Sequence, residues 1–467
     1  MLKKVKPGIT EVVLRDGQQS LIATRMKVAD MLPIIPKIDK VGFSSVEVWG
    51  GATYDCCLRY LNEDPWERLR VFKAKFKKTK LQMLLRGKNI VGYKSFDDSV
   101  LSLFIKNASK SGIDIFRTFD SLNDIRNIES SIKFINDNNK HSQGTLAYTT
   151  SPRHTNKYWL KLAKQIEDIG AKSLAIKDMS GLLRPYDAFE LISLLKKNLK
   201  IPIYLHTHAT TGLADATNLK AYEAGIDNID TSISSFSGTY SHTATESFIS
   251  MLYKDKNNPY DMDLLNEISE YFNNIRFKYQ KFEGSLKNID TKMLHSQVPG
   301  GMLSNLENQL RDLGMVEKLS ELIDEIPEIR KDLGYIPLVT PSSQIVGTQA
   351  LLNVKNGKRY ETLTNEMIEL VNGSYGRLTG TINKDLKEIV SKINTPNKIN
   401  LLTVDDYRKL FKLKCEEYNL GKLYKNDKHL MNYIFYPEIS IDYYKEQERV
   451  KEYGLFDLQE GLGVVID

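Results

Sequence analysis

Two histidines alternate at the end of a short apolar run. His206 and His208 lie on either side of Thr207, and residues two apart in a strand point to the same side. Both imidazoles can therefore reach one metal ion. Asp16 ends another such run and offers a carboxylate oxygen as a third ligand. Two imidazoles and a carboxylate suit Zn²⁺, Mn²⁺, Co²⁺ or Fe²⁺, so we expect a divalent metal site rather than a pair of structural histidines.

Lys177 ends the apolar run that precedes the histidine pair. An ammonium group repels a divalent cation, so this lysine needs a role other than direct coordination. It could bind a substrate carboxylate, or CO₂ could carbamylate it and turn it into a carboxylate that bridges to the metal. An ion pair with the neighbouring Asp178 is the remaining possibility.

Other polar side chains at the ends of such runs fit an anionic substrate. The planar guanidinium groups of Arg86 and Arg117 can each hold a carboxylate through two parallel hydrogen bonds. Gln19, Tyr93 and Thr149 could add neutral hydrogen bonds. The sequence therefore favours a small organic acid as the ligand.

The remaining histidines have weaker claims on a functional site. His154, His242 and His295 lie in expected loops, and the sequence names no partner for any of them. His141 and His429 look peripheral. We therefore include none of them among the candidate metal ligands.

The candidate residues fall at the ends of eight short runs of β-branched or apolar residues. The runs are 9–16, 44–49, 82–87, 113–119, 143–149, 173–178, 201–208 and 228–234. Their starts are roughly 27 to 38 residues apart, the length of one strand–helix unit, and amphipathic stretches lie between them. Eight units favour a (β/α)₈ barrel over an open doubly wound sheet, and the strand ends of a barrel converge on its active site.

Beyond about residue 300 the pattern becomes helical. Stretches 304–313 and 316–333 have helical periodicity, and a proline-flanked segment follows at 335–344. A charged, tyrosine-rich tail begins near Thr403. We predict an α/β protein with a (β/α)₈ TIM barrel over 1–300. A mostly helical C-terminal domain over 301–467 is expected to cover the barrel mouth.

The composition limits the class of protein. The chain has 467 residues, 41% of them hydrophobic, which is enough for a large core spread over two or three domains. The net charge of +6 is too weak a bias for a nucleic-acid-binding protein. Three cysteines cannot form a disulfide framework, and no run resembles a signal core or a membrane span. We expect a cytoplasmic protein.

Eight short segments along the chain form a characteristic series. They are RDGQQS at 15–20, WGGAT at 49–53, LNEDPW at 61–66, LLRG at 84–87, FRTFD at 116–120, IKDM at 176–179, QVPGGM at 297–302 and VTP at 339–341. In these segments, and in their order from about residue 9 to 380, the chain resembles the biotin-dependent carboxyltransferases. This family includes the carboxyltransferase part of pyruvate carboxylase, the oxaloacetate decarboxylase α chain and the metal-containing subunit of transcarboxylase.

The resemblance implies a metal site and a reaction. Asp16, carbamylated Lys177, His206 and His208 would hold a divalent ion, commonly zinc, manganese or cobalt. The reaction would move CO₂ between carboxybiotin and pyruvate or oxaloacetate through an enolate. Developing negative charge on an enolate needs positive charge nearby, which the ion would provide.

The same resemblance implies roles for residues around the metal. Arg86 would bind the substrate's carboxylate or keto oxygen, with Gln19 and Tyr93 assisting near substrate and biotin. Thr340 would shuttle a proton between the pyruvate methyl group and biotin, and Arg15 would support the polar network.

Two features depart from the family pattern. Relatives often carry a biotinyl domain with Met-Lys-Met at a hairpin tip, whereas the only Met-Lys step here is Met26-Lys27. We therefore expect biotin on a separate carrier protein, together with a biotin carboxylase or a decarboxylase membrane subunit. The stretch 235–242 also lacks an expected Gln-Pro-Pro. Family members commonly form dimers, so we expect a homo-oligomer.

An aldol- or Claisen-type metal lyase or synthase is the main alternative. Such enzymes share the barrel, the Arg-Asp-Gly turn and the alternating histidines, but usually act on an acyl-CoA and need no carbamylated lysine. Lys177, the Trp49-Gly50-Gly51 run and the Thr340 segment argue against it. A non-catalytic subunit that docks a biotin carrier is a second alternative, but the four ligand positions are intact.

Overall fold

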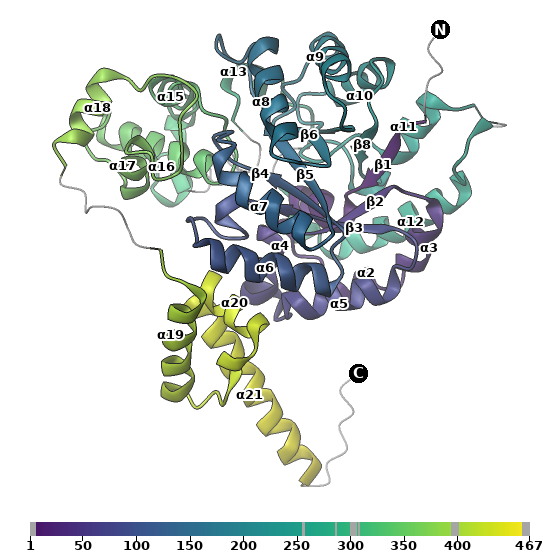
Figure 1. The fold of residues 1–467 in the computed structure, drawn as a ribbon, viewed down its shortest axis with the longest axis vertical. Helices are drawn as coiled ribbons and strands as arrows, with labels where there is room; N and C mark the ends of the chain where they lie inside the picture. The colour runs from purple at the N-terminus through teal and green to yellow at the C-terminus, as the bar shows by residue number, and fades with distance from the viewer. Residues whose placement is uncertain are drawn as a thin grey trace.

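Eight parallel strands close into a barrel in chain order, and the first strand pairs with the eighth (Figure 1). The computed structural model describes residues 6–254, 257–284, 287–298, 306, 309–393 and 401–459, with side chains to residue 450. The predicted barrel is thus confirmed. Its strands are β1 (Gly8–Glu11), β2 (Ser45–Trp49), β3 (Lys80–Leu85), β4 (Ile115–Phe119), β5 (His141–Ala147), β6 (Ser173–Asp178), β7 (Ile203–Thr207) and β8 (Asn228–Thr231).

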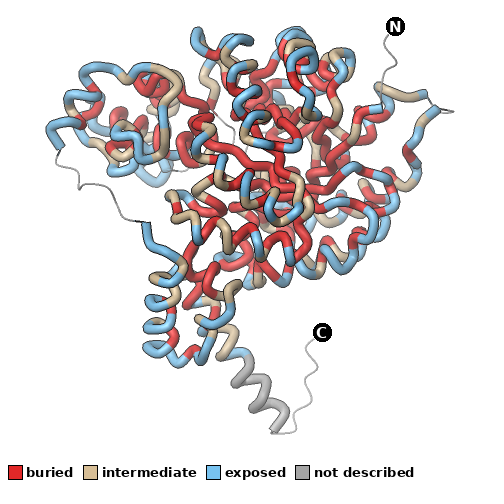
Figure 2. The backbone as a smooth tube through the Cα atoms, in the orientation of Figure 1, coloured by how far each residue is buried: buried red, intermediate tan, exposed pale blue. Residues whose placement is uncertain are grey.

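Helices cover the outer face of the barrel, so the strands are buried on both sides and contain few exposed positions (Figure 2). All five residues of β2 are buried. The helices of this part are α1 (Gln18–Ile22), α2 (Val28–Met31), α3 (Ile35–Val41), α4 (Gly51–Cys56), α5 (Pro65–Lys75), α6 (Asp98–Ser111), α7 (Arg126–Asp137), α8 (Asn156–Asp168), α9 (Pro185–Asn198), α10 (Ala214–Glu223), α11 (Thr245–Leu252), α12 (Met262–Lys278) and α13 (Met293–Ser296). None of the described helices is long and apolar enough to cross a membrane.

The first strand is shorter than the sequence predicts. It ends at Glu11, whose buried carboxylate accepts hydrogen bonds from the backbone N–H groups of Val13 and Ile233. The chain then forms a π-helical turn, Val13–Gly17, before α1. Arg15 and Asp16 therefore lie on this turn rather than on a strand, and the prediction of a strand over 9–16 is wrong in its second half. Turns of this kind often occur at functional sites.

The helices beyond the barrel form two groups (Figure 1). The first group packs around its own core, which includes Leu322, Ile326 and Val346. The second group shares the core of the barrel through residues such as Phe411 and Leu430. Their members are α15 (Leu319–Asp332), α16 (Ser342–Asn356), α17 (Asn365–Val371) and α18 (Lys384–Ser391), then α19 (Val404–Glu417), α20 (Asp427–Phe435) and α21 (Pro437–Gln459).

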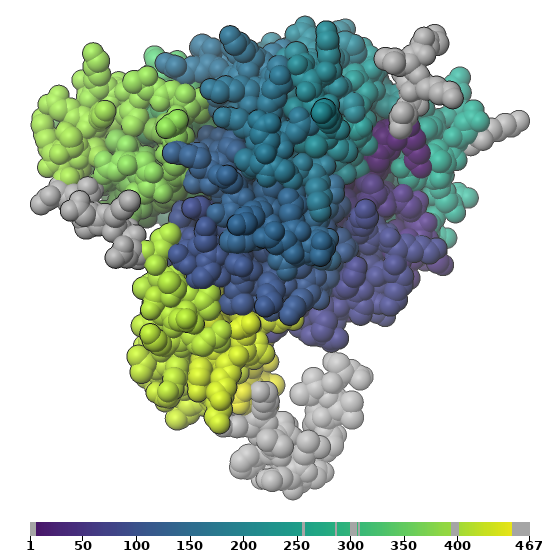
Figure 3. All heavy atoms as spheres, viewed as in Figure 1, coloured from purple at the N-terminus to yellow at the C-terminus, as the bar shows by residue number. Residues whose placement is uncertain are grey.

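Each group contacts a different part of the barrel, as the space-filling view also shows (Figure 3). In the second group, Asn432 of α20 accepts a hydrogen bond from Tyr54 of α4 at 2.5 Å. In the first group, Arg330 of α15 donates to the Thr149 hydroxyl, beyond β5, at 2.8 Å. The predicted domain boundary at 300 and the matching residues 299–302 lie outside the described part of the chain.

Candidate active site

Four buried side chains converge at the C-terminal end of the barrel. Asp16 comes from the π-helical turn, His206 is the penultimate residue of β7, His208 follows the strand, and His242 lies in the loop after β8. Oδ2 of Asp16 is 3.0 Å from Nε2 of His206 and 3.5 Å from Nε2 of His208. It is 3.2 Å from Nε2 of His242. The predicted trio of Asp16, His206 and His208 is therefore brought together, with a third histidine beside it.

The donor chemistry of this cluster fits a divalent transition metal. Each residue offers one ligand atom, and these atoms lie within 4.8 Å of one another. With metal–ligand bonds of about 2.1 Å, ligand atoms in a tetrahedral site are about 3.4 Å apart. The separations of 3.0, 3.2 and 3.5 Å bracket this value. Burial and the nearby positive charge of Lys177 lower the pKa of His206 to about 3, which keeps this imidazole neutral and able to bind a metal.

Lys177 lies against the cluster rather than paired with Asp178. Its Nζ is 2.6 Å from Nε2 of His206 and 3.8 Å from Oδ2 of Asp16. The Asp178 carboxylate instead accepts hydrogen bonds from the backbone N–H groups that follow it and from Thr207. Burial outweighs the attraction of Asp16 and lowers the pKa of Lys177 to about 8. A fraction of this amine is therefore neutral near pH 7, the form that can add CO₂.

Arg117 does not face the substrate space, contrary to the prediction. It is completely buried and makes paired contacts with the Asp230 carboxylate, one of them 3.0 Å from Nη2 to Oδ1. The other carboxylate oxygen of Asp230 accepts from Nδ1 of His206 at 2.7 Å. Arg117 holds the pKa of Asp230 well below its usual range despite burial. The pair therefore orients His206 from behind, as carboxylates commonly do for metal-binding histidines.

Arg15 likewise orients Asp16. Its Nη1 donates to Oδ1 of Asp16 at 3.0 Å and lies 3.3 Å from Oε1 of Gln19, while its Nε donates to Glu47. Burial raises the pKa of Asp16, but Arg15 and Lys177 outweigh burial and hold that pKa well below the usual range. Asp16 is therefore a carboxylate whose second oxygen is left for the cluster.

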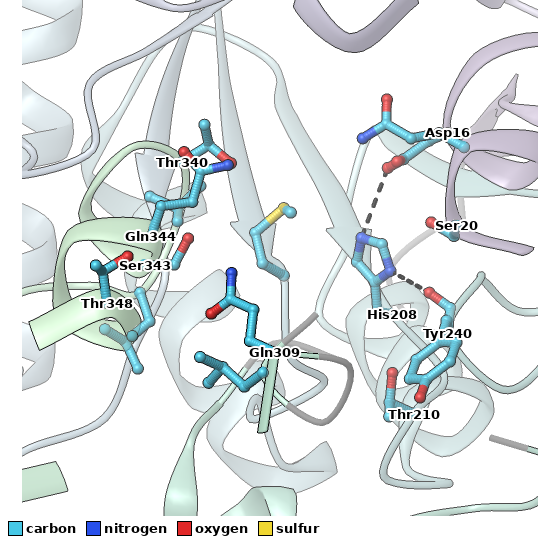
Figure 4. Close-up of a pocket in the computed structure, with 16 residues that line it drawn as sticks. Asp16, Ser20, His208, Thr210, Tyr240, Gln309, Thr340, Ser343, Gln344 and Thr348 are labelled. Atoms are coloured by element: carbon cyan, nitrogen blue, oxygen red, sulfur yellow. Dashed lines mark hydrogen bonds and ion pairs between the residues drawn. The ribbon is translucent and has the colours of Figure 1, made fainter. Parts of the chain in front are cut away.

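A cavity of about 260 Å³ separates this cluster from the first helical group. Figure 4 shows Asp16, His208 and Tyr240 on one side and Thr340 and Gln344 on the other. Gln19 also lines the cavity. The predicted residues Asp16, Gln19, His208 and Thr340 thus meet at one place, although Thr340 is more than 130 residues from His208 in the sequence.

Arg86 and Tyr93 lie to one side of this cavity. The Arg86 guanidinium donates to the backbone carbonyl of Gly92 at 3.0 Å and lies 5.0 Å from the centre of the Tyr93 ring. Tyr93 lines a neighbouring hollow, whose wall includes Gln344 and Thr348. Both of these residues also line the main cavity.

His242 is named from the sequence only as a loop histidine without a partner, and the structure places it in the cluster. A histidine followed by threonine and alanine forms no motif with the pair at 206 and 208, and it lies beyond the end of a strand. Its position after the eighth strand was the available signal, because the loops after all strands of a barrel meet at the same end.

Known proteins resemble this chain over most of its length. The HMGL-like family model matches residues 6–271, and the conserved carboxylase domain model matches residues 293–461. A pyruvate carboxylase subunit from Methanocaldococcus jannaschii is 47% identical over 441 residues, which cover 93% of this chain and 77% of that protein. The methylmalonyl-CoA carboxyltransferase 5S subunit from Propionibacterium freudenreichii subsp. shermanii is 48% identical over 372 residues, covering 79% and 73%.

Solved structures give the same result. The carboxyl transferase domain from Rhizobium etli pyruvate carboxylase with pyruvate and biocytin has a TM-score of 0.88 and 33% identity, covering 95% of this chain and 77% of that one. The carboxylase-domain match and the names of these relatives count against an aldol- or Claisen-type enzyme, which would share only the barrel. The similarity extends through barrel and helices alike, and the chain belongs to the biotin-dependent carboxyltransferase family.

Proposed function

We propose that this chain transfers a carboxyl group between carboxybiotin, borne on a separate carrier protein, and pyruvate or oxaloacetate. One observation carries the proposal: the cavity places the cluster at Asp16 and His208 opposite Thr340 of the first helical group. A substrate in this cavity would meet a cationic centre on one side and a hydroxyl on the other. The similar Rhizobium etli domain, solved with pyruvate and biocytin, supports the choice of ligands.

Asp16, His206, His208 and carbamylated Lys177 are the proposed ligands of a divalent metal, of which zinc, manganese and cobalt are the candidates. When bound, the metal supplies positive charge that stabilises an enolate oxygen. The chain's own residues do the rest. Arg15 holds Asp16 ionised and Asp230 orients His206, so that the positively charged centre is preorganised before substrate arrives.

Substrate binding is proposed for Arg86, Gln19, Tyr93 and Arg15. The buried Arg15 guanidinium forms ion pairs with Asp16 and Glu47, so its proposed contribution acts through Gln19, which it contacts at 3.3 Å. Arg86 uses Nη1 on the carbonyls of Val91 and Gly92. Its remaining guanidinium donors can be offered to a carboxylate.

Thr340 is the proposed proton carrier. In the carboxylating direction, carboxybiotin releases CO₂ and its ring nitrogen gains a proton from the Thr340 hydroxyl. That hydroxyl takes a proton from C3 of pyruvate, and the resulting enolate carbon attacks CO₂ to form oxaloacetate. Protons and electron pairs balance, and the reverse sequence decarboxylates oxaloacetate.

Oxaloacetate decarboxylation by the full chain, with and without free biotin, tests this function. We expect biotin to stimulate the wild-type rate and to have no effect on Lys177→Ala. Lys172→Ala is the matched control, because Lys172 lies before β6 and its Nζ donates to the carbonyl of Lys140. A wild-type rate that ignores biotin would reject the proposal.

The proposed partners follow from the same chemistry. A biotin carboxyl carrier protein would present carboxybiotin, and a biotin carboxylase or a decarboxylase membrane subunit would complete the reaction cycle. We further propose that the chain forms a homodimer. Mixing the chain with a biotinylated carrier and measuring transfer to pyruvate would test the first of these interactions.

A further inference from the structure

His242 is a completely buried imidazole in the metal-ligating cluster that the proposed reaction leaves without a role. Its ring centre is 4.5 Å from that of His206 and 4.3 Å from that of His208. The described residues that line the cavity include Asp16 and His208 but not His242. A contact with substrate therefore does not explain its position, and the function of its inward nitrogen must lie within the cluster.

The hydrogen bonds at the back of the three rings determine which nitrogen carries the proton. Nδ1 of His242 is 2.9 Å from the backbone carbonyl oxygen of Thr207, and a carbonyl oxygen can only accept. The hydrogen of a neutral His242 therefore lies on Nδ1, and the lone pair lies on Nε2. Nδ1 of His208 faces the carbonyl oxygen of Tyr240 at 2.6 Å in the same way.

Nδ1 of His206 likewise faces an acceptor, the Asp230 carboxylate, at 2.7 Å. When neutral, all three imidazoles thus direct an Nε2 lone pair into the cluster, where Oδ2 of Asp16 is also an acceptor. At His206 the Nζ of Lys177 lies 2.6 Å from this nitrogen. The distance from that oxygen to Nε2 of His242 is 3.2 Å. Acceptors that face one another at this distance repel unless a cation lies among them. The Lys177 ammonium lies beside His206 and Asp16, and a cation is still needed at His208 and His242.

Protonating His242 would be a poor substitute for that cation. Asp16 already contacts two positive groups, Nη1 of Arg15 at 3.0 Å and Nζ of Lys177 at 3.8 Å. An imidazolium would add a third buried positive charge beside one carboxylate. A metal ion instead satisfies all the inward lone pairs at once.

Backbone hydrogen bonds fix the loop that carries His242. The N–H of Ser241 donates to the carbonyl of Gly238 at 2.7 Å, and the N–H of Gly238 donates to the carbonyl of His242 at 2.9 Å. This closed turn needs a φ of +72° at Gly238, which glycine adopts without strain. The carbonyl of Ser241 also accepts from Ala209 N–H at 2.7 Å, next to the histidine pair.

We propose that His242 is itself a metal ligand, so that Asp16 and three imidazoles complete a four-donor site without Lys177. This inference rests on the metal site of the proposed function and extends it. Carbamylation of Lys177 would then add a fifth donor and adjust the reactivity of the ion, whereas retention of the ion would not depend on it.

Two substitutions at His242 separate a ligand from a merely structural residue. In His242→Asn, the amide nitrogen takes the position of Nδ1 and can keep the bond to Thr207, but no atom replaces Nε2. In His242→Gln, an amide atom takes the position of Nε2 and the bond to Thr207 is lost. His141→Asn is the control, since His141 begins β5 at the far end of the barrel and contacts Ser173 at 2.7 Å.

Zn²⁺ binding to the full-length chain is measured by metal analysis and by competition with a chelating dye, and Co²⁺ loading is followed by visible absorption. We expect His242→Asn to weaken Zn²⁺ binding more than about 100-fold, because loss of an outer partner alone costs about 10- to 100-fold. His242→Gln should weaken it less, and Lys177→Ala should retain one ion per chain. The Co²⁺ spectrum should change in His242→Asn and stay unchanged in His141→Asn.

Unchanged Zn²⁺ affinity and an unchanged Co²⁺ spectrum in His242→Asn would overturn the inference. If both variants fail to fold, X-ray absorption of the wild-type Co²⁺ protein gives the number of imidazole ligands bound to the ion. Three imidazoles are expected, and two would contradict the proposal. Wild-type protein with two imidazoles and biotin-stimulated activity would reject this inference alone. Three imidazoles without that activity would reject the proposed function and leave the ligand assignment standing.

Discussion

The guanidinium of Arg330 spans the gap between the first helical group and the barrel, donating from Nη2 to the Thr149 hydroxyl at 2.8 Å. The same nitrogen donates to the carbonyl of Thr150 at 2.9 Å, and Nε donates to the carbonyl of Ile336. Ile336 lies four residues before Thr340. Arg330 therefore couples the position of the Thr340 segment to the end of β5.

Replacing Arg330 by alanine should lower carboxyl transfer by about 10- to 100-fold, because a displacement of about 1 Å in a reacting group can cost about 100-fold. Metal content should be unchanged, since Arg330 does not contact the cluster. Arg359→Ala is the control: Arg359 lies in the same helical group and pairs with Glu325 on a partly exposed surface. Transfer at the wild-type rate in Arg330→Ala would show that this contact does not position Thr340.

The buried pair of Arg117 and Asp230 gives a prediction about stability. Asp230→Asn removes the negative charge and leaves the Arg117 guanidinium, at a position with no exposed surface, with only the more distant Glu47 carboxylate 3.9 Å from its Nη1. Breaking such a pair from one side typically costs about 3–5 kcal/mol. We expect the urea midpoint of unfolding to fall accordingly. Asp227→Asn is a suitable comparison, because its pair with Lys196 is about one-third exposed and should contribute under about 1 kcal/mol.

The barrel itself is predictable because its information is local and repeated. Each strand–helix unit carries its own apolar run, and the eight close in chain order as expected. The predicted strand over 9–16 is too long, since the end of β1 depends on Glu11 accepting from Ile233, 222 residues away. The hydrophobic periodicity of a sequence does not reveal a contact between residues so far apart.

The site is predictable only in part for a similar reason. Asp16, His206 and His208 can be identified because each follows an apolar run, and the same logic assigns Arg117 to substrate. The structure shows that Arg117 binds Asp230 instead. The two residues lie on different strands, and nothing in the sequence around either one indicates that they pair. His242 is named from the sequence as a loop histidine but not as a member of the cluster, because a loop, rather than a strand, brings it to Asp16.

Glu11 should make stability depend on pH. Burial raises its pKa to about 8 from an ordinary value of 4.5. The folded state therefore binds this proton more tightly than the unfolded state, and its contribution to stability is complete below about pH 4.5 and is lost as the pH rises to about 8. Thermal unfolding measured at intervals across this range should show the midpoint of wild type falling.

Glu11→Gln should reduce that fall, because glutamine resembles the protonated acid. Its amide oxygen can accept from Val13 and Ile233, and its amide nitrogen can donate to the Thr245 hydroxyl that Glu11 now contacts at 2.7 Å. The variant should therefore be more stable than wild type near pH 8 and similar to it near about pH 5. Parallel pH profiles for the two proteins would contradict the raised pKa of Glu11.

Thr340 gives the sharpest test of the proton transfer. Thr340→Ala removes the hydroxyl that faces Asp16 and His208 across the cavity, so biotin-dependent transfer should fall by about 100-fold or more, as expected for loss of a group that moves a proton. Thr340→Ser keeps a hydroxyl and should recover most of the rate. Metal content should stay constant in both variants, since neither touches the cluster. Exchange of the C3 protons of pyruvate with solvent should be lost in Thr340→Ala and retained in Thr340→Ser. If Thr340→Ala transferred carboxyl groups at the wild-type rate, another group would have to carry the proton.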